Sequence, residues 1–138
     1  MLILNQVPEI KRLFQKKPKV VLLVDDDTQF LSLGQELLEY LGFQALTASH
    51  SDQALEIFRQ RQQEIDLVIL DFNLPRINGY QLLHQLQIIA PQIKVIVASG
   101  FFGQAEIDKF LQAGVAGMIH KPFRAQQLQV EILRVLGD

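Results

Sequence analysis

The chain contains no cysteine among its 138 residues, and no apolar run approaches the length that spans a bilayer. The lack of cysteine excludes a disulfide framework, thiolate metal sites and cysteine nucleophiles. A bilayer-spanning helix needs about 20 consecutive apolar residues, and the opening run of residues 2–4 is too short, and wrongly flanked, for a signal peptide. These absences predict a soluble, cytoplasmic protein without membrane insertion, whose chemistry must use groups other than thiols.

The sequence also lacks the excess of positive charge that is typical of nucleic-acid-binding proteins. The formal net charge is -2, but residues 1–19 hold five basic side chains against Glu9, and the remainder holds eight basic against fourteen acidic side chains. A domain with this net negative charge offers no positively charged surface for the phosphate backbone of a nucleic acid. Direct nucleic-acid binding is therefore not expected.

The length and the hydrophobic content of 49% suit a single domain with a core of its own. Residues 1–18 stand apart because apolar side chains are mixed there with the charged Lys11, Arg12, Lys16 and Lys17, before the regular alternation begins after Pro18. We interpret residues 1–18 as an N-terminal arm or linker and residues 19–138 as the domain. Whether the arm is a linker from a longer protein or a docking or dimerisation helix stays open at this point.

Short apolar runs alternate with amphipathic stretches after Pro18, with glycine and proline between them. The pattern predicts strands at residues 20–24, 43–47, 67–70, 93–98 and 115–119, and helices at residues 30–41, 54–58, 82–89, 107–111 and 128–136. Strands that are apolar on both sides, such as residues 20–24, are typical of parallel sheets covered by helices on both faces. Right-handed crossovers then give an α/β fold with a doubly wound (βα)₅ sheet.

Polar side chains stand at the carboxyl ends of four predicted strands. They are Asp25, Asp26 and Asp27 after the first, Asp71 after the third, Ser99 after the fourth and Lys121 after the fifth. Each taken alone has an ordinary role as a helix N-cap or a turn residue. In an open α/β sheet, however, the carboxyl ends of the strands form the ligand-binding edge. We therefore expect these side chains to share one crevice.

At least three carboxylates around one crevice repel each other unless a cation compensates them. Two unit charges about 4 Å apart repel by roughly 4 kcal/mol at an effective dielectric constant near 20. Oxygen ligands from a few carboxylates, with room for water and a phosphate oxygen, suit Mg²⁺. Phosphoryl transfer depends on positioning and charge stabilisation, and a crevice with carboxylates, a hydroxyl and an ammonium group supplies both.

Four segments of the sequence resemble the receiver domain of bacterial two-component response regulators, from about Lys19 to the end of the chain. They are "VLLVDDD", "DLVILDFNLPRINGY", "VIVASG" and "AGVAGMIHKPF", in the family's order and spacing. The resemblance implies a flavodoxin-like sheet with strand order 2-1-3-4-5. It also implies that the domain is a phosphoacceptor in signal transduction rather than an enzyme, and that Asp71 is the residue that is phosphorylated.

The resemblance assigns roles to the other residues of the crevice. Asp26 and Asp71 would bind Mg²⁺, Asp25 would assist through water, and the backbone carbonyl of Asn73 would complete the metal site. Lys121 and Ser99 would then hold the phosphoryl oxygens, since lysine offers a compact point charge and a serine hydroxyl turns toward a new acceptor.

The same resemblance implies the partners. A histidine kinase or a histidine phosphotransfer protein would donate the phosphoryl group. The output, to a downstream protein or to an output domain outside this sequence, would pass through the face formed by the fourth helix, the fifth strand and the fifth helix. The chain departs from the family on this face because Met118 stands where an aromatic residue is usual. His50, His84 and His120 lack the features of a donor histidine, and we interpret them as surface or loop residues.

Two other functions remain as alternatives. A haloacid-dehalogenase-type phosphatase would use Asp25 as its nucleophile in the Asp-x-Asp spacing of residues 25–27, but the acidic pair that this family needs after the lysine is missing. A flavodoxin-like mononucleotide-binding protein would need a first loop rich in glycine, serine and threonine to cradle phosphate. Three aspartates in that loop would repel the phosphate instead.

Overall fold

The computed structural model describes residues 17–72 and 79–137. Within these residues, parallel strands alternate with helices along the chain. The strands are β1 (Val20–Val24), β2 (Gln44–Ala48), β3 (Ile65–Asp71), β4 (Lys94–Ser99) and β5 (Gly117–His120). The helices are α2 (Thr28–Tyr40), α3 (Ser51–Arg61), α4 (Gly79–Ile89), α5 (Gln104–Gln112) and α6 (Ala125–Leu136).

Each predicted strand and helix is present, and the differences lie at the ends of the elements. The helices begin a few residues before the apolar positions from which they were predicted, because their first turns contain polar residues. For example, α2 begins after Asp27, whose side chain caps the helix. The strand predicted at residues 115–119 is wrong at its start, since β5 begins at Gly117. Val115 instead closes the turn after α5 by donating its N–H to the Phe110 carbonyl.

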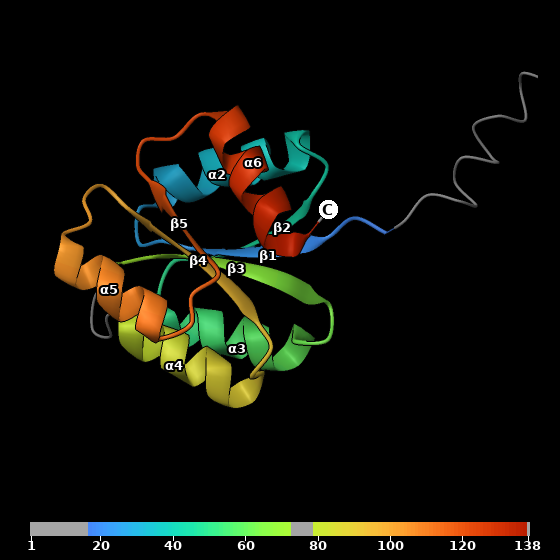
Figure 1. The fold of residues 1–138 in the computed structure, drawn as a ribbon. Helices are drawn as coiled ribbons and strands as arrows, with labels where there is room; N and C mark the ends of the chain where they lie inside the picture. Colours follow the sequence, from blue (N-terminus) through green and yellow to red (C-terminus); the bar gives the residue numbers. More distant parts are fainter. Residues whose placement is uncertain (1–16, 73–78, 138) are drawn as a thin grey trace, which may run out of the picture.

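The five strands form one parallel sheet in the order β2-β1-β3-β4-β5, which confirms the predicted fold class (Figure 1). In the register of the central strands, Val24 at the end of β1 pairs with Leu70 of β3, and Asp71 pairs with Ala98 of β4. The direction of winding reverses between β1 and β3, because β2 lies on one side of β1 and β3 on the other. The carboxyl ends of β1 and β3 therefore form the crevice where ligands of such sheets bind.

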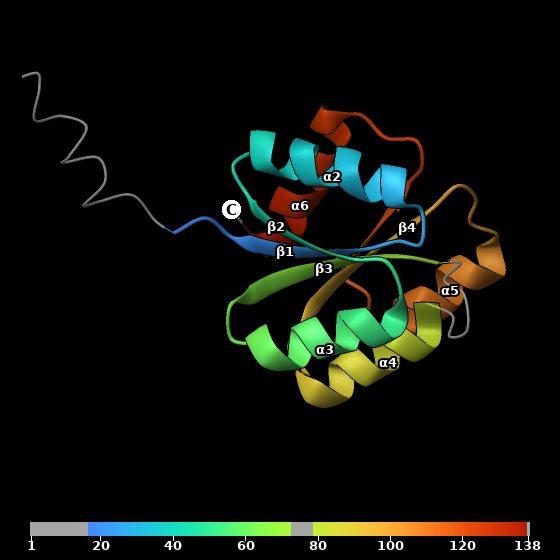
Figure 2. The same cartoon turned by 180° about the vertical axis from the view of Figure 1, so that it is seen from behind.

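Helices cover both faces of the sheet, with α2 and α6 on one side and α3, α4 and α5 on the other (Figures 1 and 2). Successive residues of β1 point into opposite cores: Leu22 and Val24 pack with the α3, α4 and α5 side, and Val21 and Leu23 pack with the α2 and α6 side. All five residues of β1 are buried. Two hydrophobic cores thus hold the central strands rigidly between the helical layers.

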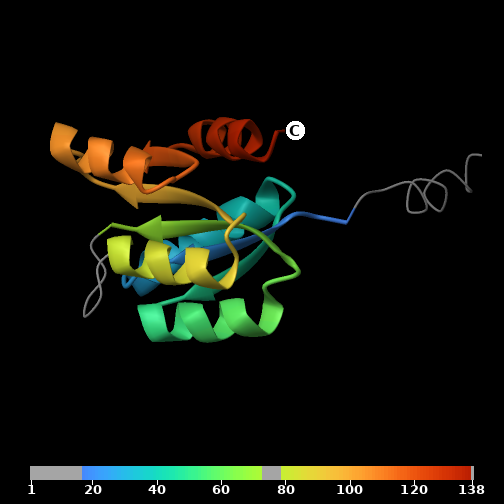
Figure 3. The same ribbon diagram turned by 60° about the horizontal axis from the view of Figure 1, so that its bottom comes forward.

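The three helices of the larger layer follow one another across the sheet in the order α3, α4, α5 (Figure 3). Gly79, the first residue of α4, lies close to the end of β3, where a Cβ atom would approach the Phe72 carbonyl oxygen to 3.2 Å and the side chain of Leu70 to 3.1 Å. A larger residue would require the end of β3 or the start of α4 to shift by a few tenths of an ångström. None of the described helices is long and apolar enough to cross a bilayer.

Candidate functional site

The predicted site residues lie at the carboxyl end of the sheet, as the pattern of strand ends indicates. Asp25 and Asp26 follow β1 directly, and Asp71 is the last residue of β3. Ser99 ends β4, and Lys121 follows β5. Because neighbouring parallel strands end at the same edge, residues that are distant in the sequence meet here.

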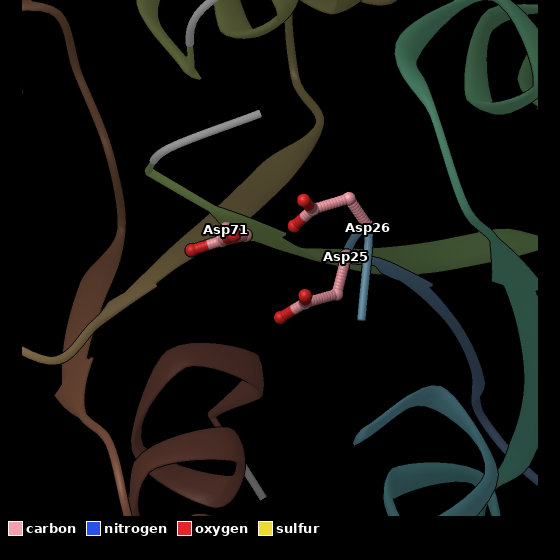
Figure 4. Close-up of side chains that lie close together, drawn as sticks. All are labelled: Asp25, Asp26 and Asp71. Atoms are coloured by element: carbon pink, nitrogen blue, oxygen red, sulfur yellow. The ribbon is translucent and has the colours of Figure 1, made fainter. Parts of the chain in front are cut away.

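Asp25, Asp26 and Asp71 form an acidic cluster (Figure 4). Each offers one carboxylate oxygen, and these three oxygens lie within 4.8 Å of one another. Asp25 and Asp71 are buried, with exposed fractions of 1% and 8%, while Asp26 is exposed to solvent. The cluster therefore has two carboxylates fixed in the protein and a third at the entrance.

Lys121 supplies positive charge to this cluster. Its Nζ pairs with Oδ2 of Asp25 in a short contact, and it lies 3.4 Å from Oδ1 of Asp71. The other oxygen of Asp25, Oδ1, accepts the backbone N–H of Asp27 at 2.9 Å. Asp25 is thus occupied on both oxygens, and Lys121, which follows the edge strand β5, connects it with Asp71 at the ends of the adjacent strands β1 and β3.

Three carboxylates and one ammonium group leave the cluster with an excess of negative charge. The donors are all oxygen atoms, and one carboxylate is open to solvent, so the set fits a hard divalent cation that keeps part of its water shell, such as Mg²⁺. The predicted fourth ligand, the carbonyl of Asn73, lies outside the described residues. The described residues therefore fit the metal that the sequence predicts.

Ser99 is buried beside this cluster, with its hydroxyl bonded to the backbone of the loop that follows. Its Oγ donates to the Phe101 carbonyl at 2.8 Å and accepts the Phe101 N–H at 3.2 Å. The carbonyl of Ser99 accepts the backbone N–H of Lys121 at 2.8 Å. Ser99 consequently links the β4–α5 loop to the residue that carries the ammonium group.

Sequence reasoning did not find the two aromatic residues beside Lys121. The Phe30 ring lies under the ammonium group, with Nζ 4.3 Å from the ring centroid. Phe123 contacts the Phe30 ring edge-on, with centroids 5.8 Å apart and an interplanar angle of 87°. The only signal in the sequence was their position, three residues after Asp27 and two residues after Lys121.

A second aromatic group begins at Phe72, the residue after Asp71, and joins α4 to α5. Phe72 contacts Tyr80 and Phe110 edge-on, and the rings of Tyr80 and Phe110 are stacked with centroids 4.3 Å apart. The Tyr80 hydroxyl donates to the Glu106 carbonyl at 3.3 Å. Burial, and to a lesser degree the Glu106 carboxylate, raise the pKa of Tyr80 above its usual value.

The remaining predictions concern histidines and Met118. His50, His84 and His120 are exposed, which confirms them as surface residues; His50 also accepts the Gln53 N–H through Nδ1 as the N-cap of α3. Met118 is partly buried in β5 and packs against the core on the α3, α4 and α5 side. It also lines a groove between β5 and α6.

Comparison with known proteins gives the same family from sequence and from structure. A family model described as the response regulator receiver domain matches residues 21–133. The two-component response regulator ARR14 of Arabidopsis thaliana is 33% identical over 109 residues, which are 79% of this chain and 28% of that protein. The transcriptional regulatory protein CpxR of Escherichia coli is 34% identical over 119 residues, which are 84% of this chain and 48% of that protein.

Among solved structures, a response regulator receiver domain protein from Clostridium thermocellum superimposes with a TM-score of 0.82 at 30% identity, over 86% of this chain and 94% of that one. The chain spans about half or less of the two curated relatives described above. Since the family model covers most of the sequence and the fold agrees, the chain belongs to the receiver domain family of two-component response regulators.

Proposed function

We propose that this domain is a Mg²⁺-dependent phosphoacceptor, which takes a phosphoryl group onto Asp71 from a histidine kinase or a histidine phosphotransfer protein. The observation that carries the proposal is the convergence of Asp71, Asp25, Asp26 and Lys121 at the carboxyl end of the sheet. Two buried acids beside an exposed one are costly to keep together for stability alone. A site that must bind a cation and an anion at once explains the arrangement.

In the proposed step, a carboxylate oxygen of Asp71 attacks the phosphorus atom of a phosphohistidine. The new bond joins this oxygen to phosphorus, and the phosphorus–nitrogen bond breaks with its electron pair left on the imidazole nitrogen. The product on the protein is an acyl phosphate. Lys121 lies 3.4 Å from Asp71 Oδ1, so its ammonium group is near the position where the transferred group would carry its charge.

Asp71 suits the acceptor role better than Asp25, which the phosphatase alternative would use. Both oxygens of Asp25 are engaged, one by the Asp27 N–H and one by Lys121, and its exposed fraction is only 1%. Asp26 and Asp71 would hold Mg²⁺, with Asp25 assisting through water, together with the Asn73 carbonyl that the family resemblance implies. The bound cation would offset the charge of the phosphoryl oxygens.

The phosphoryl group would act on the rest of the domain through Ser99. It adds about -1.5 to -2 charge at neutral pH, which gives the Ser99 hydroxyl a stronger acceptor than the Phe101 carbonyl that it bonds to now. Turning the hydroxyl would release one bond of the β4–α5 loop and bias the face formed by α5, β5 and α6. We propose this face as the contact surface for a downstream protein or an output domain.

The proposed face carries apolar side chains that are exposed to solvent in this domain. Leu111 of α5 and Val130 of α6 are each 60% exposed, and Phe101 in the β4–α5 loop is 77% exposed. Val130 and Met118 line the groove between α6 and β5. Exposed apolar side chains beside a groove suit contact with a protein partner.

Intact-mass measurement after incubation with acetyl phosphate and Mg²⁺ tests the proposal. Wild type should gain the mass of one phosphoryl group, and this gain should disappear with a chelator. Asp71→Asn should gain none. Asp71→Glu is the matched variant, because it keeps the negative charge but moves the carboxylate by one methylene group. A normal adduct on Asp71→Asn would contradict the assignment, and an adduct that maps to Asp25 would favour the phosphatase alternative.

A further inference from the structure

We propose that Phe30 is a positioning residue for Lys121, holding the ammonium group against the face of its ring between Asp25 and Asp71. This inference rests on the proposed function, because it names a further residue that this phosphoacceptor site needs. Lys121 Nζ lies 4.3 Å from the centroid of the Phe30 ring, within the range of a cation–π interaction. The same nitrogen pairs with Asp25 and lies 3.4 Å from Asp71.

The position of the Phe30 ring is set by the acidic loop itself. Asp25 Oδ1 accepts the Asp27 N–H at 2.9 Å, and Asp27 Oδ1 in turn accepts the Phe30 N–H at 3.2 Å. Phe30 therefore lies in the first turn of α2, at a place fixed by the carboxylate that pairs with Lys121. The acid, the helix cap and the ring form one connected unit.

Phe123, which lies close to Lys121 in the sequence, packs against the Phe30 ring. It follows Lys121 by two residues and meets the Phe30 ring edge-on at 87°. In such an edge-on pair, the positive edge of one ring meets the negative face of the other, which favours this arrangement of the two rings. Phe30 and Phe123 also line an apolar surface groove next to Lys121, together with Leu33 and Leu37 of α2.

A phenyl ring has a specific advantage at this position. The lysine side chain is a flexible four-carbon stem that ends in three N–H donors. A polar neighbour would occupy one of these donors, whereas the ring face attracts the cation without accepting a directed bond. Phe30 thus restricts the ammonium group while its donors remain available for Asp25, Asp71 and the transferred phosphoryl group.

Graded fluorination of the Phe30 ring tests the inference, because fluorine weakens the negative ring face while leaving its shape almost unchanged. Phenylalanine, 4-fluorophenylalanine and 3,4,5-trifluorophenylalanine would be introduced at position 30 in the full chain. We expect the rate of phosphoryl uptake from acetyl phosphate to fall stepwise, by about fivefold in total. Phe30→Leu should lose at least as much, and Phe30→Tyr should stay within about twofold of wild type.

A second measurement is independent of phosphorylation. In the protein without phosphodonor, the Lys121 Hε protons should show an upfield ring-current shift that disappears in Phe30→Leu. Phe43→Leu is the matched control, since Phe43 packs against the same core as Phe30, and it should change neither the shift nor the rate beyond about twofold.

The outcomes separate this inference from the proposed function. Equal rates across the fluorinated series, or a ring-current shift that persists in Phe30→Leu, would overturn the positioning role. A wild type that takes up no phosphoryl group on Asp71 would overturn the proposed function, while the ring-current shift would still report whether Phe30 holds Lys121.

Discussion

The two ends of the parallel sheet use charged side chains in opposite ways. At the amino end, Asp66 accepts the Val20 N–H at 2.8 Å, and Lys94 donates to the Val135 carbonyl at 2.7 Å. Each of these side chains forms a hydrogen bond with a backbone group at the end of a strand or helix, where regular backbone pairing stops. At the carboxyl end, Asp25 and Asp71 are buried close to Asp26 and share Lys121, and Asp25 also accepts the Asp27 N–H.

The difference teaches which charges stabilise the fold and which serve the site. A side chain that bonds to the backbone improves the stability of the element that it touches. A cluster of like charges lowers stability unless a cation compensates it. Removing a carboxylate should therefore lower stability at the amino end but not at the carboxyl end. Four variants, three of them with a control variant, test the comparison from the largest expected effect to the smallest.

Removing Lys121 should have the largest effect, because it is the cation that compensates two buried carboxylates. We expect Lys121→Met to slow phosphoryl uptake by about a hundredfold. In magnesium-free buffer the free energy of unfolding should fall by about 2 kcal/mol, less than for a fully buried pair because Lys121 is partly exposed. Mass spectrometry and urea unfolding with EDTA measure the two effects.

The matched control for Lys121 is Lys94→Met at the opposite end of the sheet. This variant should lose about 1 kcal/mol of stability, since it removes one bond to the Val135 carbonyl. Its rate of phosphoryl uptake should equal that of wild type. Similar losses of rate in both lysine variants would contradict the distinction between the two ends.

Removing Asp26 should weaken the metal site without weakening the fold. We expect Asp26→Ala to bind Mg²⁺ about tenfold or more weakly, because one oxygen ligand is lost. In EDTA its melting temperature should equal or exceed that of wild type, since repulsion within the cluster is relieved. Isothermal titration with Mg²⁺ and thermal melts measure these quantities.

Asp27 is the natural control for Asp26, because it is the next residue but caps α2 with its side chain. Asp27→Ala should lose about 1 kcal/mol of stability while its affinity for Mg²⁺ changes little. A large loss of stability in Asp26→Ala would instead mean that Asp26 has a structural role.

Ser99 combines the properties of both ends, since it lies at the site yet bonds to the backbone of Phe101. We expect Ser99→Ala to take up phosphate on Asp71 but to lose most of the response of residues 100–124 to beryllofluoride and Mg²⁺. Met118→Ala should change this response only modestly, because an unbranched methionine adapts to the space around it. Amide chemical shifts or hydrogen exchange of these residues measure the response.

A full response in Ser99→Ala would show that the signal passes by another route. Lys121 would then be the next residue to test, because its N–H bonds to the Ser99 carbonyl.

The smallest effect is expected at Asp66, where the comparison predicts a purely structural role. Asp66→Ala should lower the free energy of unfolding by about 1 kcal/mol, since the Val20 N–H loses its acceptor. Its Mg²⁺ affinity and its rate of phosphoryl uptake should equal those of wild type. Urea unfolding and the same binding titration measure this, and a change in Mg²⁺ affinity would mean that charge at the amino end reaches the site.

Much of the fold could be predicted from the sequence because the hydrophobic pattern is local. β1 coincides with the predicted strand at residues 20–24. This run of five apolar residues is bounded by the charged Lys19 and Asp25, and a short run that is apolar on both sides is typical of a central parallel strand. Element ends were less predictable. In the turn after α5, the Val115 N–H donates to the Phe110 carbonyl, so it is not available for strand pairing. The apolar pattern of the sequence does not show whether a turn or a strand uses this N–H.

The sequence by itself determined which residues stand at the strand ends, and therefore that carboxylates, a hydroxyl and an ammonium group meet at one edge. Only the tertiary structure decided how they pair. Lys121 and Asp25 are 96 positions apart, and their contact depends on how the β5–α6 loop packs against α2. The contact of Lys121 with Phe30 depends on the same packing, and no local pattern encodes it, because a phenylalanine in a first helical turn looks the same whether it faces a core or a cation.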